Sequence, residues 1–252
     1  MATDACAQLP PVSADYTPKG RYETIAGLKT YIIGPTNPTR AIVDVYDVFG
    51  LAPQTLQGAD RLSALASALV LVPDFFDGDA ASPDWFPADT PEKEAARNGF
   101  LRERADVGAA VERLVALRGE LGARWPGVED RVGVFGLCFG GKVAVLATGE
   151  GNEGRGRRFA VSGTAHPARL EAKDAEALTA PHICLASPGE PADVVAQYKE
   201  ILSRPGKTGH VETYDKMFHG WMGARANLSD ETNLAEYERG YNQVSEYFSK
   251  YL

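Results

Sequence analysis

Short apolar runs alternate with amphipathic helical segments along most of this chain, and this alternation most limits its fold. The runs are short, rich in β-branched and aromatic residues, and bounded by Gly, Pro or Asp. They cover residues 29–34, 41–46, 69–72, 131–136, 159–163, 182–187 and 210–214. Strands that alternate with helices predict an α/β fold, in which a mostly parallel central sheet carries helices on both faces. In such sheets ligands bind at the carboxyl ends of the strands.

The 252 residues suit one large domain better than two small ones. We expect residues 1–20, with three prolines, to form an extended arm and residues 21–252 to form a single α/β domain. Residues 74–100 lack a regular pattern and are predicted to be an irregular loop. The aromatic side chains of this loop favour a cover over a pocket, although they could equally belong to the core beneath it.

Charge and cysteine content exclude several classes of function. The formal net charge is −8, and no run is rich in Lys or Arg, so neither nucleic acid nor an anionic membrane surface is expected as a partner. No apolar run approaches the roughly 20 residues that cross a bilayer. The cysteines are Cys6, Cys138 and Cys184, an odd and sparse set that argues against a disulfide framework. With no secretory signal pattern at the N-terminus, we expect a reducing, cytoplasmic location.

The segment Gly136-Leu-Cys138-Phe-Gly140-Gly141 follows a predicted strand and begins a predicted helix. Its spacing is that of the nucleophile elbow, G-x-S-x-G, with Cys in place of Ser. A sharp strand-to-helix turn exposes the central side chain, and the flanking glycines avoid Cβ collisions. The helix N-terminus favours a thiolate and an oxyanion. Cys138 is therefore the candidate nucleophile, and the alternative is a buried cysteine in a glycine-rich turn.

A thiol nucleophile needs a base and an orienting acid. His219 follows the last predicted strand, in a turn with Gly220, which gives the nucleophile–acid–base order of the α/β-hydrolase fold. We favour Asp193, after the preceding strand, as the acid, with Glu190 as the alternative. His166 follows another strand and could line the pocket. The scattered histidines and cysteines lack the spacing of metal ligands, so no metal is expected.

These segments together resemble the dienelactone hydrolase family, a cysteine-nucleophile branch of the α/β-hydrolases, and in particular its fungal-type members. The resemblance rests on residues 136–141, Asp193 and residues 218–221, and also on residues 44–51 and 72–78. It extends from about Tyr22 to the C-terminus. It implies acyl transfer through a thioester, with no cofactor.

The resemblance also implies roles for further residues. The backbone N–H groups of Phe139 and Val48 would form the oxyanion hole. Asp47 takes the place of the acidic residue, usually Glu, that contacts the resting thiol in bacterial members, and it is one methylene shorter. Arg225 lies slightly displaced from the arginine that holds a substrate carboxylate in members acting on dienelactone, with Arg102 and Arg104 as alternatives.

From these residues we predict a hydrolase that cleaves an ester or lactone through a Cys138–Asp193–His219 triad. Five aromatic residues are expected to line an apolar or aromatic acyl pocket, namely Phe75, Phe76, Trp85, Phe86 and Trp221. The competing hypotheses are an acyltransferase or lyase on the same scaffold and a binding protein without catalysis. The expected partner is a small-molecule ester or lactone, bound by a monomer or homodimer, and the sequence does not name that substrate.

Overall fold

The computed structural model describes residues 9–152 and 157–252. Among them an eight-stranded sheet runs in the order β1-β2-β4-β3-β5-β6-β7-β8. The first two pairings, β1 with β2 and β2 with β4, are antiparallel, and the others are parallel. The strands are β1 (Arg21–Ile25), β2 (Leu28–Ile33), β3 (Ala41–Val45), β4 (Leu69–Pro73), β5 (Val132–Leu137), β6 (Val161–Ala165), β7 (His182–Ala186) and β8 (Gly209–Thr213).

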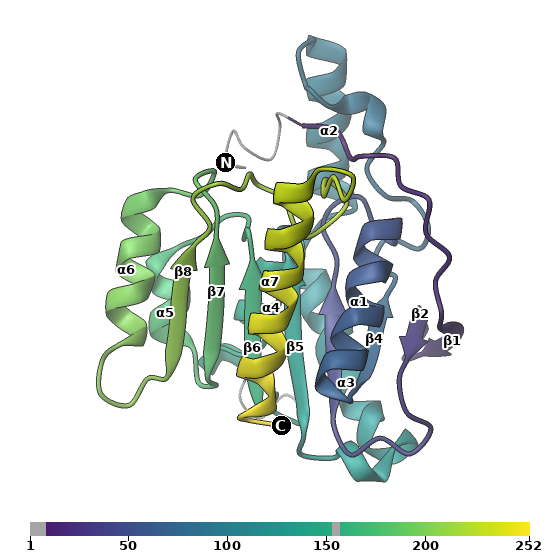
Figure 1. Ribbon diagram of the computed structural model, residues 1–252, viewed down its shortest axis with the longest axis vertical. Coiled ribbons are helices and arrows are strands. Elements are labelled where there is room, and N and C mark those ends of the chain that lie inside the picture. The colour runs from purple at the N-terminus through teal and green to yellow at the C-terminus, as the bar shows by residue number, and fades with distance from the viewer. Residues whose placement is uncertain (1–8, 153–156) are drawn as a thin grey trace.

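Helices cover both faces of this sheet (Figure 1). α1 packs with α7 on one face, and α3 packs with α4 on the other. The helices are α1 (Pro53–Ala66), α2 (Pro91–Glu103), α3 (Val107–Arg124), α4 (Phe139–Ala147), α5 (Ala172–Ala177), α6 (Ala192–Leu202) and α7 (Glu231–Ser249), with single 3₁₀ turns at η2 (Pro83–Trp85), η3 (Pro126–Val128) and η4 (Glu150–Asn152). The predicted α/β architecture, mostly parallel with helices on both faces, is confirmed.

The central strands consist mainly of apolar and small residues on both faces. Every residue of β3 to β7 is buried, as expected for parallel strands that lie between two helical layers. The edge strands β1 and β8 are partly exposed. The apolar stripe of α7 is buried at Tyr237, Tyr241, Val244 and Phe248. These side chains complete the core on the α1 face.

Residues 74–100 differ from the prediction of an irregular loop. They contain η2 and most of α2, which projects beyond the sheet at the end where the N-terminal arm begins (Figure 1). Pro91 lies in the first turn of α2, where proline is tolerated because its missing N–H would have no partner there. The Thr90 side chain caps the helix by accepting from Lys93 N–H. The prediction also missed β1 and α5, and it began β6 two residues too early.

The N-terminal arm, from residue 9 to β1, has no helix or strand. Val12 N–H donates to Ala224 O at 2.9 Å, and Tyr16 Oη donates to Asp60 on α1 at 2.6 Å. Figure 1 shows this segment passing α1 on its way to β1. Residues 1–8, with Cys6, lie outside the described part of the chain.

Candidate active site

Cys138 stands between β5 and α4 in a backbone conformation that few residues adopt. Its φ is 53° and its ψ is −109°, a strained combination for a residue with a side chain. A Cβ at Gly136 would collide with the carbonyl of Gly140, and one at Gly140 with the carbonyl of Val45. The two glycines therefore permit the turn that the elbow spacing predicts. The Cys138 side chain is nearly buried, at 2% exposure, and it lines a cavity.

Val48 and Phe139 line the same cavity as Cys138. Phe139 is the first residue of α4, so its N–H has no intrahelical acceptor. Val48 follows β3 and is fixed by its carbonyl, which accepts from Ala81 N–H at 2.9 Å. The arrangement suits the pair of backbone donors that an oxyanion hole needs, and the donor role itself stays a prediction.

His219 is buried after β8, and its Nδ1 lies 2.7 Å from Glu190 Oε1. The other Glu190 oxygen, Oε2, accepts from Ser187 N–H at 2.5 Å, in the tight turn that follows β7. This carboxylate is buried together with the imidazole. Glu190 thus has the position of an orienting acid.

Asp193, the favoured acid in the sequence prediction, does not have this position, and that prediction is wrong. Asp193 lies within the first turn of α6, where its side chain is exposed. A carboxylate there stabilises the helix N-terminus. Glu190, the alternative, precedes α6, and its carboxylate contacts His219.

Asp47 accepts two backbone hydrogen bonds, and its predicted contact with the Cys138 thiol stays a prediction. Asp47 Oδ1 accepts from Phe49 N–H, and its Oδ2 accepts from Ala224 N–H, both at 2.9 Å. Burial raises the pKa of Asp47, while these two N–H groups and the Arg225 charge oppose the rise. Asp47 therefore ties the loop after β3 to the loop that carries His219.

Arg225 is buried and does not line the cavity beside Cys138. Its Nε donates to Leu9 O at 2.6 Å, and its guanidinium lies 5.1 Å from the Phe49 ring centre and 5.5 Å from that of Phe86. This geometry does not support the expectation that Arg225 binds a substrate carboxylate. Arg102 and Arg104 are surface side chains, paired with Glu103 and Asp79.

The predicted pocket aromatics are mostly core. Trp221 is fully buried and stacks on Tyr214 with 4.4 Å between ring centres. Phe76 packs beneath Phe139, and Trp85 packs on Phe100. Of the aromatic residues predicted for the pocket, Phe86 lines the cavity, whereas the other four do not.

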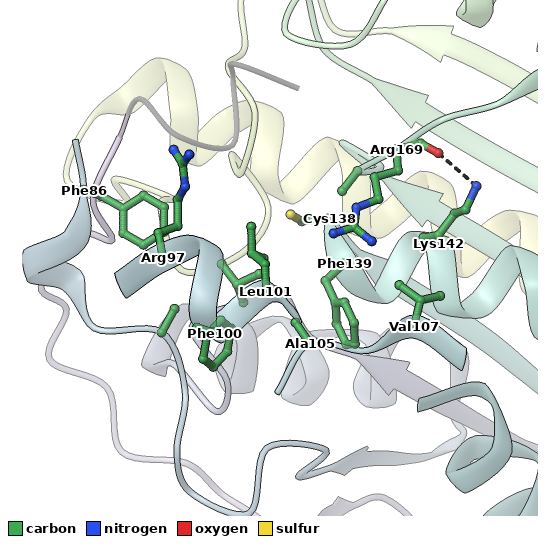
Figure 2. A pocket seen from close by; sticks show the side chains of 13 residues that line it. Phe86, Arg97, Phe100, Leu101, Ala105, Val107, Cys138, Phe139, Lys142 and Arg169 are labelled. Atoms are coloured by element: carbon green, nitrogen blue, oxygen red, sulfur yellow. Dashed lines mark hydrogen bonds between the residues drawn. The ribbon is translucent and has the colours of Figure 1, made fainter. Parts of the chain in front are cut away.

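The cavity beside Cys138 encloses about 580 Å³, part of it open to solvent, and its wall is mainly apolar. α2 contributes Arg97, Phe100 and Leu101, and Figure 2 shows them across the cavity from Cys138. The cavity is lined by Val48, Ala81, Phe86, Arg97, Phe100, Leu101, Ala105, Val107, Cys138, Phe139, Lys142, Ala168 and Arg169.

Three cationic side chains at this cavity, Arg97, Lys142 and Arg169, were not found from the sequence. Lys142 Nζ donates to Asp174 at 2.5 Å, to Glu171 at 2.6 Å and to Arg169 O at 3.0 Å. These bonds fix the segment that carries Arg169, whose φ is 51°. Lys142, on α4, follows Cys138 by four residues. That spacing is about one helical turn, so the sequence could have predicted that Lys142 lies near Cys138.

The described residues contain no cluster of three or more His, Cys, Asp or Glu side chains arranged to hold a metal ion. Within the same ranges, no helix is long and apolar enough to cross a membrane.

A sequence profile of the dienelactone hydrolase family matches residues 28–252. The chain belongs to the dienelactone hydrolase family. Two uncharacterized AIM2 family proteins of Schizosaccharomyces pombe are similar to it. One is 31% identical over 240 residues, covering 94% of this chain and 93% of the relative, and the other is 32% identical over 243 residues, covering 95% of each.

A solved structure of a dienelactone hydrolase-like promiscuous phosphotriesterase from metagenomic libraries has a TM-score of 0.67 to this chain. Its identity is 19%, and the match covers 92% of this chain and 98% of that one. This likeness shows the α/β-hydrolase fold. The resemblance to fungal-type dienelactone hydrolases that the motifs indicated is confirmed, and a hydrolase of the ester or lactone type is the activity that the family supports.

Proposed function

We propose that this protein hydrolyses a carboxylic ester or lactone through a thioester on Cys138, with His219 as general base and Glu190 as the orienting acid. The observation that carries the proposal is the buried 2.7 Å contact between His219 Nδ1 and Glu190 Oε1. It lies at the carboxyl ends of the strands, where Cys138 directly precedes α4 in its strained conformation. Nucleophile, base and orienting acid are the parts of an acyl-transfer triad.

The reaction follows from these groups. His219 Nε2 takes the Sγ proton, and the thiolate attacks the carbonyl carbon. The N–H groups of Phe139 and Val48 donate to the resulting oxyanion. The carbon–oxygen bond to the leaving alcohol breaks as His219 returns the proton to that oxygen. A water then attacks the thioester, giving its proton to His219, and the acid leaves as the thiol is restored.

The apolar wall of the cavity supports a substrate with an apolar acyl group. An apolar acyl group would bury against Phe86, Phe100 and Leu101. The guanidinium groups of Arg97 and Arg169 lie on either side of the Cys138 sulfur in the view of Figure 2. A substrate carboxylate would pair with one of them, and not with Arg225.

The test is hydrolysis of a panel of aryl esters and lactones by the wild type and by Cys138→Ala. We expect kcat to fall by about 10³-fold or more, with the melting temperature little changed. Iodoacetamide should label Cys138 in step with the loss of activity. Cys184→Ala, which alters a buried cysteine of β7, is the matched control and should keep its turnover. Full turnover in Cys138→Ala would overturn the proposal.

A further inference from the structure

His166 is a buried polar side chain at the site that the proposed reaction does not use. It follows β6 directly, with a φ of 39°, and its side chain is fully buried. Neither ring nitrogen has a hydrogen-bond partner within the described parts of the chain. Burying such nitrogens without partners costs about 1–3 kcal/mol, so an apolar residue here would cost less.

The ring of His166 lies against the ring of His219. The ring centres are 5.3 Å apart, and the planes meet at 70°, an edge-to-face arrangement. The backbone holds His166 in place, because its N–H donates to Leu185 O at 2.8 Å, on β7. The adjoining residues hold the elbow, since Cys138 N–H donates to Ala165 O and Ala168 N–H donates to Cys138 O.

The electrostatic surroundings keep His166 neutral. Burial lowers its pKa well below the usual value, and the charges of His219 and Arg225 lower it further. A neutral imidazole can lie beside His219 in both protonation states of that base. A second imidazolium there would oppose the proton transfer from Cys138.

The hydrogen bond from His219 Nδ1 to Glu190 tolerates a range of angles, so it leaves the His219 ring some rotation about its Cβ–Cγ bond. A second ring packed edge-to-face removes this freedom. Small errors of placement matter, because a displacement of about 1 Å in an active site can reduce the rate about a hundredfold.

We propose that His166 is a positioning residue, whose ring fixes the plane of the His219 imidazole while Glu190 holds its Nδ1. The inference rests on the proposed function, in which His219 is the general base. It assigns no contact with substrate to His166. The residue acts through His219.

The experiment compares three variants with the wild type: His166→Ala, His166→Asn and His166→Phe. We expect Ala and Asn to lower kcat about ten- to a hundredfold with KM changed less than twofold. Phe retains a ring at this position and should restore kcat to within about threefold of the wild type. The pH profile of Cys138 alkylation by iodoacetamide should move to higher pH in Ala and Asn, because a tilted imidazolium stabilises the thiolate less.

His182→Ala is the matched control. His182 is also fully buried, but it begins β7 at the other end of the sheet and bonds Ser162 through Nδ1 at 2.7 Å. This variant should lose thermal stability and keep the alkylation profile and kcat. If His166→Ala does not fold, His166→Asn takes its place with the same expectation.

Unchanged kcat and alkylation in His166→Ala, or a Phe variant as impaired as Ala, would overturn the positioning role. A shift of the alkylation profile in His182→Ala as large as that in His166→Ala would also overturn it. Failure of the proposed function would instead appear as retained turnover in Cys138→Ala. The two failures can therefore be distinguished.

Discussion

Glu190 and Asp193 are three residues apart, yet only Glu190 contacts the candidate base. The reason is where α6 begins. Pro191 occupies the position just before the first residue of α6, so Asp193 is already in the helix and is exposed, while Glu190 lies in the preceding turn and contacts His219. An orienting carboxylate accepts Nδ1–H and thereby fixes the tautomer that leaves Nε2 able to take a proton.

Replacing Glu190 by Gln tests this assignment. Gln keeps the length of the side chain but can present an amide N–H to His219, which favours the wrong tautomer. We expect kcat for an aryl ester to fall by about 10²–10⁴-fold. Asp193→Asn is the matched control and should stay within about twofold of the wild type. Equal losses in the two variants would contradict the assignment of Glu190.

At the scale of elements, α2 shows what the sequence could and could not predict. The central strands and α1, α3, α4, α6 and α7 follow from apolar periodicity, because each buries a continuous face. α2 buries only Phe100 and covers a cavity instead of a core, so its apolar pattern is weak. The lack of a regular pattern predicts a loop, although Pro91 lies where a helix accepts proline.

The same distinction applies to the site. Cys138 and its glycines are local in sequence, so their turn could be predicted from spacing. Which acid reaches His219, and which arginine faces the cavity, depends on loops that meet only in the folded chain. Arg169 follows β6 and lines the cavity with Cys138, and Lys142 Nζ donates to its carbonyl, a contact across 27 residues. Spacing within one segment cannot show such a contact.

The part of α2 that covers the cavity should determine acyl preference. Leu101 lines the apolar wall, and Leu101→Ser would remove apolar contact with a longer acyl chain. We expect the ratio of kcat/KM for a butyrate ester to that for an acetate ester to fall about tenfold. Ala95→Ser, at an exposed position of α2, is the control and should leave the ratio unchanged. An unchanged ratio in Leu101→Ser would contradict the placement of the acyl group under α2.

At the scale of the whole molecule, the sheet carries a buried carboxyl group at its centre. Asp44 lies on β3, is fully buried, and neither of its oxygens has a hydrogen-bond partner among the described residues. Burial, together with the nearby charge of Asp47, raises its pKa to about 8. The folded protein therefore keeps this proton at a pH where the unfolded chain, with a pKa near 3.8, has lost it.

This difference makes stability depend on pH in a direction that can be worked out. Between about pH 4 and pH 8 the folded state binds more protons at Asp44 than the unfolded state does. The free energy of unfolding should then fall as pH rises through this range, by up to about 1.4 kcal/mol per pH unit, and level off above the folded pKa. Asp44→Asn keeps the shape and cannot ionise, so the decline due to Asp44 should be missing.

Urea unfolding at pH 5, 6, 7 and 8 measures this effect, with Asp215→Asn, at an exposed carboxylate after β8, as the control. The wild type and Asp215→Asn should lose stability in parallel as pH rises, while the Asp44→Asn curve should be flatter and approach or cross the wild-type curve at higher pH. Parallel curves for all three proteins would show that Asp44 is ionised in the folded state, and the sheet would then have to hold a charge at its centre.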